Sequence, residues 1–180
     1  MRAPRTILIA LAAALLAAFA MAGCGSEEHS VEVNEGEPLE LGELHYNVQI
    51  TRYLNPFSPE DSQYLKGAPE LNDQEQYLGV FMEVENEGDE ENVVPYPFKI
   101  VDTRGNVFEQ VKGMDNPFVL IPGTPVPVDG QVPNIESAAA NGPIEGSLIL
   151  FVLPEAANEN RPLQLVVPGP GEPGKIELDL

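Results

Sequence analysis

Closely spaced carboxylates make residues 80–94, with the sequence VFMEVENEGDEENVV, the first place to look for chemistry. Glu85, Glu87 and Asp89 stand at alternate positions, as the first oxygen ligands of an EF-hand calcium loop do. Such a loop also needs glycine at its sixth position and glutamate at its twelfth, yet the sixth residue from Glu85 is Glu90 and the twelfth is not glutamate. The pattern leaves a weak calcium or other cation contact through these three carboxylates as one alternative, and it predicts no strong metal site.

The same stretch also has the composition of a turn. Apolar residues alternate up to Val84 and resume at Val93, and the sequence Asn-Glu-Gly-Asp at residues 86–89 is typical of turns. Gly88 can take a positive φ there without a steric cost. We therefore expect an acidic turn that joins the two strands of a β-hairpin between Val84 and Val93.

Nucleophilic catalysis needs a base within hydrogen-bond reach of the nucleophile, and the only two histidines are His29 and His45. The sequence contains no Gly-x-Ser-x-Gly elbow, no paired histidines at zinc spacing and no phosphate-binding loop. Two carboxylates alone can hydrolyse glycosides, so a carboxylate-dependent envelope hydrolase is a second alternative. With 29 acidic residues, however, the closeness of any two of them carries no information. We expect a protein that is not an enzyme and has no catalytic residues.

The charge of the chain is strongly negative. Its 180 residues include 29 Asp and Glu against 9 Lys and Arg, and the formal net charge is −20. Such a surface repels nucleic acid, so we expect no nucleic-acid partner. Cys24 is the only cysteine, which excludes an intrachain disulfide and a cysteine-based zinc site.

A secretory leader precedes that cysteine. Residues 1–23 have the pattern of a signal peptide, with a short basic start, an apolar run over residues 7–19 and small residues at the end. As a helix the run would span only about 20 Å, which is too short to cross a hydrocarbon core of about 30 Å. Met21-Ala22-Gly23-Cys24 resembles the lipobox of bacterial lipoproteins. The resemblance implies cleavage before Cys24 and covalent diacylglycerol on its thiol, with an N-acyl group such as palmitate as a further modification and no other cofactor.

Acyl chains on Cys24 are sufficient for stable membrane anchoring when two or more are present. Residues 24–40 are polar and acidic, and we expect them to be the lipidated cysteine and a flexible tether. Residues 41–180 are expected to form one folded domain. We thus expect an exported protein at the outer face of the cytoplasmic membrane or at the cell surface. Its partners would be the membrane, through the lipid anchor, and an unidentified envelope or extracellular protein.

The part of the chain expected to fold has the two-residue period of β-strands. In residues 44–52 this period places four apolar side chains on one face, namely Leu44, Tyr46, Val48 and Ile50. The other expected strands are residues 77–86, 98–101, 107–111, 144–153, 163–167 and 176–180. Residues 144–153 are apolar at successive positions, which is typical of a strand covered on both faces.

Turn and loop signals separate these strands. Gly105 lies in a tight turn over residues 102–106, which predicts a hairpin, and residues 55–73 and 112–143 are rich in proline, which predicts long loops. No segment has the period of an amphipathic helix. The sequence therefore predicts an all-β fold, an antiparallel immunoglobulin-like β-sandwich of about six to eight strands.

Three segments resemble successive signatures of a bacterial protein family. They are Tyr77–Asp89, Phe98–Phe108 and Gly146–Pro154. In this order, behind a lipobox, they are similar to an extracytoplasmic domain of uncharacterised function that is common in Gram-positive and actinobacterial lipoproteins. That domain is similar in fold to a mycobacterial secreted immunoprotective antigen with an immunoglobulin-like sandwich. The resemblance covers residues 41–167 and departs from the family at Asn141-Gly142-Pro143, where a Pro-Gly turn is usual.

The family resemblance also bears on function. It implies no catalytic residues, because none are established for the family as a class. Together with the lipobox at Cys24, it implies a lipid-anchored, extracytoplasmic, non-catalytic binding or interaction module of the bacterial cell envelope.

Overall fold

The structure is a computed structural model that describes residues 31–180. The expected signal peptide and the lipidation site at Cys24 lie outside the described residues. The strands are β1 (Glu32–Asn34), β2 (Leu39–Leu41), β3 (Leu44–Leu54), β4 (Glu75–Asn86), β5 (Asn92–Val93), β6 (Lys99–Val101), β7 (Val107–Glu109), β8 (Pro125–Val126), β9 (Gln131–Val132), β10 (Ser147–Pro154), β11 (Leu163–Val167) and β12 (Gly174–Leu178). A short 3₁₀ helix, η1 (Glu155–Glu159), follows β10.

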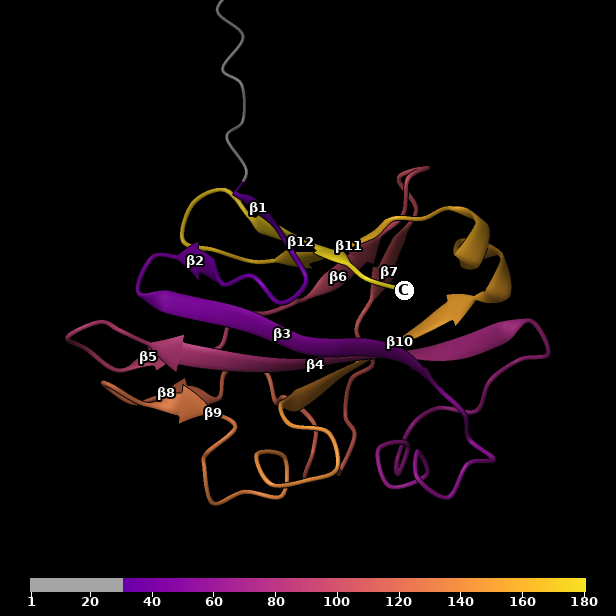
Figure 1. Ribbon diagram of the computed structural model, residues 1–180, viewed down its shortest axis with the longest axis horizontal. Coiled ribbons are helices and arrows are strands. Elements are labelled where there is room, and N and C mark those ends of the chain that lie inside the picture. Colours follow the sequence, from indigo (N-terminus) through magenta and orange to yellow (C-terminus); the bar gives the residue numbers. More distant parts are fainter. Residues whose placement is uncertain (1–30) are drawn as a thin grey trace, which may run out of the picture.

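Two main sheets pack against each other (Figure 1). One has the strand order β1-β12-β11-β6-β7, and the other has the order β10-β4-β3-β2, with β9 also paired to β4. Strands β5 and β8 form a separate two-stranded pair. Within the described range every strand pair is antiparallel except that of β1 and β12. The predicted all-β antiparallel sandwich is therefore confirmed.

Twelve strands are found in residues 31–180, more than the expected six to eight. Seven of them correspond to the expected strands. The five others, β1, β2, β5, β8 and β9, are only two or three residues long. Runs this short show no alternation of their own. β6 and β7, with three residues each, are predicted because the turn at Gly105 joins them, and β5 lies where the expected hairpin returns at Val93, whereas no such signal marks β1, β2, β8 or β9.

The main hydrophobic core fills the space between the two large sheets. One sheet contributes alternate residues of β3 and β4, such as Val48 and Val80, and the other contributes residues such as Ile100, Leu165 and Ile176, all fully buried. This alternation is the expected consequence of successive side chains pointing to opposite faces of a strand. The core thus holds the ends of the sandwich, where the turns lie, at fixed positions.

A second, smaller core covers the outer face of β4 and β10. It contains Phe81, Leu148 and Leu150, and the loop between β3 and β4 adds the buried ring of Tyr64. Tyr64 packs edge-on against Phe81, with 5.1 Å between the ring centroids. The predicted burial of β10 on both faces is confirmed, and the predicted loop before β4 serves as its cover.

The predicted face of β3 is wrong at one residue. Leu44, Tyr46 and Val48 are buried as expected, but Ile50 is 41% exposed. The register with β4 shifts between Val48 and Ile50, which marks a β-bulge. The extra residue of a bulge reverses the alternation beyond it, and this depends on the partner strand.

The expected flexible tether over residues 24–40 is also wrong in its described part. β1 pairs with β12, and Leu39 in β2 is fully buried. The carboxylate of Glu35, just after β1, accepts hydrogen bonds from the backbone N–H groups of Thr51 (2.8 Å) and Asp179 (2.9 Å). The folded domain therefore includes β1 and β2, within residues that were expected to belong to the tether.

Candidate functional site

The acidic segment after β4 is a turn, but it does not form the expected hairpin. β5 pairs with β8 rather than with β4. The predicted hairpin between Val84 and Val93 is therefore wrong, because residues 87–91 lead the chain away from β4 instead of back along it. The other predicted hairpin, with Gly105 at φ 80° between β6 and β7, is confirmed.

The side chain of Asn86 holds the acidic turn in place. Asn86 is 2% exposed, and its amide nitrogen donates to the carbonyl oxygens of Glu90 (2.8 Å), Val126 (2.9 Å) and Pro127 (3.2 Å). Its amide oxygen accepts from the backbone N–H of Gly88 (3.0 Å). One buried amide thus ties the turn to the segment that contains β8.

Gly88 is needed in this turn for a different reason than expected. Its φ is not among the positive values, but a Cβ built there would lie 2.4 Å from Cδ of Glu43 and 2.8 Å from its Cβ. A side chain at this position would therefore have to displace the side chain of Glu43, because the β2–β3 turn packs directly against Gly88.

The three candidate calcium ligands, Glu85, Glu87 and Asp89, are all exposed. Glu87 lies 3.2 Å from Nδ1 of His45. Within residues 31–180 no group of three or more His, Cys, Asp or Glu side chains is arranged to hold a metal ion. The structure therefore does not bring the three carboxylates together as a ligand set.

Two other carboxylates line a small cleft of about 160 Å³. Glu83 is half-buried on β4, and Glu145 is exposed beside it. Burial raises the pKa of Glu83, and the negative charges of Glu85 and Glu145 raise it further. Both Glu83 oxygens already accept hydrogen bonds, from the side-chain amides of Gln49 (3.3 Å) and Gln131. Glu83 cannot be singled out from the sequence, because the alternation of residues along a strand does not reveal how deeply an outward residue is covered.

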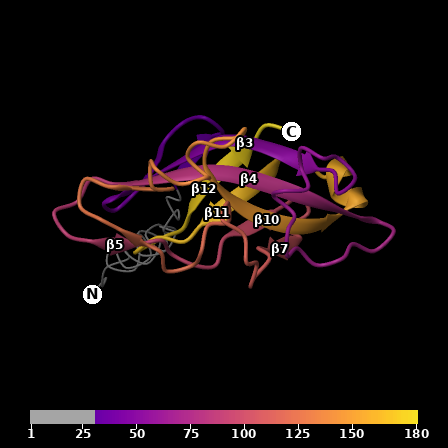
Figure 2. The same cartoon turned by 90° about the horizontal axis from the view of Figure 1, so that it is seen from below.

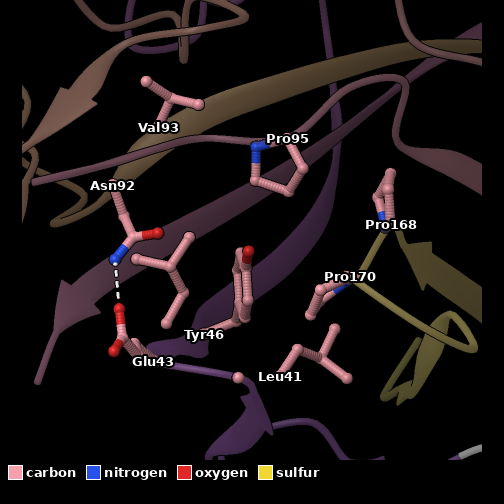
Figure 3. A pocket seen from close by; sticks show the side chains of 11 residues that line it. Leu41, Glu43, Tyr46, Asn92, Val93, Pro95, Pro168 and Pro170 are labelled. Carbon is pink, nitrogen blue, oxygen red and sulfur yellow. Dashed lines mark hydrogen bonds between the residues drawn. The ribbon is translucent and has the colours of Figure 1, made fainter. Parts of the chain in front are cut away.

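The larger of these two candidate sites is an apolar cleft of about 440 Å³, whose lining side chains are shown in Figure 3. Three separate segments form it: the β2–β3 turn, the chain at β5, and the loop between β11 and β12. The lining residues are Leu41, Gly42, Glu43, Leu44, Tyr46, Asn92, Val93, Pro95, Pro168, Gly169 and Pro170. Figure 2 shows β5 and the β11–β12 loop toward the same end of the molecule.

Tyr46 provides the polar group inside this apolar cleft. Its side chain is 1% exposed, and the hydroxyl end of its ring points into the space between the labelled side chains (Figure 3). No residue of the described range forms a hydrogen bond with this hydroxyl. Burial raises the pKa of the Tyr46 phenol, so the group remains an O–H donor at physiological pH.

The rim of the cleft carries its charge. The carboxylate of Glu43 accepts a hydrogen bond from the side-chain amide of Asn92 (2.9 Å), as drawn in Figure 3. Val93, on the same rim, is 57% exposed. The sequence places Tyr46 on an inward face but contains no signal that its hydroxyl would meet a cleft, since the other walls come from distant segments.

Among the described residues no helix has the length and apolar composition needed to cross a membrane.

No family model matches the chain, and no curated protein matches it significantly. Solved structures do match. The chain is similar to an uncharacterised β-sandwich protein from Clostridium difficile 630 (12% identity, TM-score 0.52, covering 85% of this chain and 97% of that one). It is also similar to the yjhA protein from Bacillus subtilis (12% identity, TM-score 0.51, covering 83% and 99%).

A third match is the secreted protein MPT63 from Mycobacterium tuberculosis. It shares 15% identity and a TM-score of 0.52, with 85% of this chain and 99% of that chain covered. Identities this low establish the fold alone. The fold implied by the sequence resemblance is confirmed: this chain has the β-sandwich fold of bacterial proteins that include the mycobacterial secreted protein MPT63.

Proposed function

We propose that this protein is a lipid-anchored, extracytoplasmic, non-catalytic binding module of the bacterial cell envelope. The observation that carries the proposal is the lipobox-like sequence ending at Cys24, which lies only eight positions before β1 begins at Glu32. A diacylglycerol group on Cys24 together with an N-acyl chain would anchor the protein stably.

The position of β1 sets the distance between the anchor and the domain. Seven residues separate Cys24 from Glu32, and a chain of that length spans at most about 25 Å when fully extended. The sandwich would therefore stand close to the membrane surface. The longer tether expected from composition would have allowed about twice this reach.

Binding, rather than catalysis, is supported by the two clefts. The apolar cleft offers a concave site with one polar group, which is the usual form of a ligand-binding site. In the smaller cleft, amide donors already occupy both oxygens of Glu83. His45, which could serve as a base, contacts the exposed carboxylate of Glu87.

The anchoring is tested by substituting the cysteine. We expect Cys24→Ser to move the protein from the membrane fraction to the soluble or secreted fraction, and we expect mass spectrometry of the wild-type N-terminal peptide to show diacylglycerol on Cys24. Ser26→Ala is the matched control and should leave both results unchanged. If Cys24→Ser remained membrane-bound and normally processed, the proposal would be wrong.

A further inference from the structure

The ring of Tyr46 is buried, but its hydroxyl opens into the cleft and has no hydrogen-bond partner within the described protein. A ligand in the cleft, or water in its place, can therefore accept the hydrogen bond of this hydroxyl. We propose that the cleft binds an uncharged acyl ester from the membrane, with its carbonyl oxygen accepting the hydrogen bond of Tyr46. The membrane as the source of this ligand rests on the proposed anchoring through Cys24.

The walls of the cleft favour an apolar ligand. Leu41, Leu44 and Val93 supply aliphatic surface, and three proline rings supply more. Burying methylene groups against such walls removes apolar surface from water, which is favourable. The volume of about 440 Å³ lies within the range of small-molecule sites. An acyl chain has the apolar body that these walls require.

The charge of the protein argues against an anionic ligand. Glu43 stands on the rim, held by Asn92, and the formal net charge of the whole chain is −20. A free fatty acid would carry its carboxylate into this negative field, whereas an ester of the same chain is neutral. An ester oxygen also accepts a hydrogen bond but does not donate one, which matches the phenol donor of Tyr46.

The cleft lies at the end of the domain where the described chain begins. β1 runs parallel to β12, so its first residue, Glu32, lies beside Lys175 at the start of β12. The loop just before β12 contributes Pro168 and Pro170 to the cleft. Figure 1 shows β1, the β2–β3 turn and this loop gathered at one end of the sandwich. An anchor on Cys24 would therefore hold the cleft near the membrane.

The test uses the mature chain from residue 24 onward, made unlipidated by Cys24→Ser, and titrates it with monooctanoylglycerol below its critical micelle concentration. NMR chemical shifts of isotope-labelled protein give the affinity and the site. We expect saturable shifts at Gly42, Val93 and Gly169. Octanoate, which has the same chain with a carboxylate, should bind at least about tenfold more weakly, because its charge meets the acidic rim.

Two pairs of variants test the site itself. Tyr46→Phe keeps the ring and removes the donor, so the affinity for the ester should fall about fivefold, the equivalent of about 1 kcal/mol for one hydrogen bond. Tyr53→Phe is the control: it removes a hydroxyl that donates to Asn158, outside the cleft, and the affinity for the ester should stay unchanged. Val93→Asp should weaken binding more than about tenfold by placing a charge on the apolar rim, while Val107→Asp, at a similarly exposed β7 position, should not.

Several results would overturn the inference. These are the absence of saturable shifts with the ester, equal binding of octanoate, or unchanged affinity in both Tyr46→Phe and Val93→Asp. If Tyr46→Phe failed to fold, the Val93→Asp comparison alone would decide. Because this titration uses unlipidated protein, it does not depend on the anchor. If the ester bound but Cys24→Ser remained in the membrane fraction, the binding site would be retained. The membrane as the source of the ester would then be refuted, because that source rests on anchoring through Cys24.

Discussion

Replacing Asn86 by alanine should lower the stability of the protein by a large and calculable amount. The side chain of Asn86 takes part in five hydrogen bonds: its amide nitrogen donates to three carbonyl oxygens, and its amide oxygen accepts from the backbone N–H of Gly88 and from the side-chain amide of Asn92. The alanine variant loses these bonds and leaves the buried carbonyl of Val126 without that donor. The segment after β4 would then be released from the segment that contains β8.

The magnitude follows from the geometry. An amide nitrogen has two hydrogens for its three acceptors, so the substitution removes about two donor bonds and one or two acceptor bonds. At about 1 kcal/mol net for each bond, the free energy of unfolding should fall by about 3 kcal/mol. For a domain of about 150 residues this corresponds to a decrease in melting temperature of about 6 to 12 °C.

The assay is urea denaturation of the wild type, Asn86→Ala and the control Asn158→Ala, with circular dichroism as the readout. Asn158 is exposed, and its replacement should cost at most about 0.5 kcal/mol. Asn86→Asp provides a sharper test, because its carboxylate would face carbonyl oxygens. That variant should be less stable at neutral pH than near pH 4, where protonation returns a donor. A loss below about 1 kcal/mol for Asn86→Ala, or no pH effect for Asn86→Asp, would refute the role given to this amide.

Three further predictions concern other contacts. Burial alone would raise the pKa of Asp102. Four hydrogen bonds to its carboxylate, from two backbone N–H groups and two side-chain amides, nevertheless hold this pKa below its usual range. The stability that Asp102 contributes is therefore present above its unfolded-state pKa of about 3.9 and is lost as the pH falls through the lower folded-state pKa. Urea titrations at acid pH should show this loss in the wild type and a flatter profile in Asp102→Asn, and equal profiles would contradict the assignment. Gly88→Ala should destabilise the domain by about 1 to 2 kcal/mol, because the new methyl group displaces Glu43, and the cost should shrink in a Glu43→Ala background if that clash is its cause. Glu35→Ala should cost about 2 kcal/mol in thermal unfolding and speed hydrogen exchange of the Thr51 N–H, which loses its acceptor; an unchanged exchange rate would show that the contact is not stable in solution.

The long strands could be predicted from the sequence because alternation is a local property of the chain. β3, β4 and β10 were all expected, and the burial of β10 on both faces could be inferred from its uninterrupted apolar residues. The exposure of Ile50 could not be predicted from the sequence, because the bulge in β3 arises only from the pairing of β3 with β4. β1 could not be predicted because no hairpin turn marks it, as Gly105 marks the equally short β6 and β7, and because its partner, β12, lies at the other end of the sequence.

Some features of the candidate site could likewise be predicted from the sequence, and others depended on the tertiary structure. The sequence by itself determined the lipobox-like motif at Cys24, the acidity of residues 80–94 and the all-β character of the domain, since each is written in neighbouring residues. Only the tertiary structure decided that Asn86 secures the acidic turn and that Tyr46 lies at the base of a cleft. The physical reason is distance along the chain: the cleft walls come from residues 41–46, 92–95 and 168–170, and only the packing of the two sheets brings these segments together.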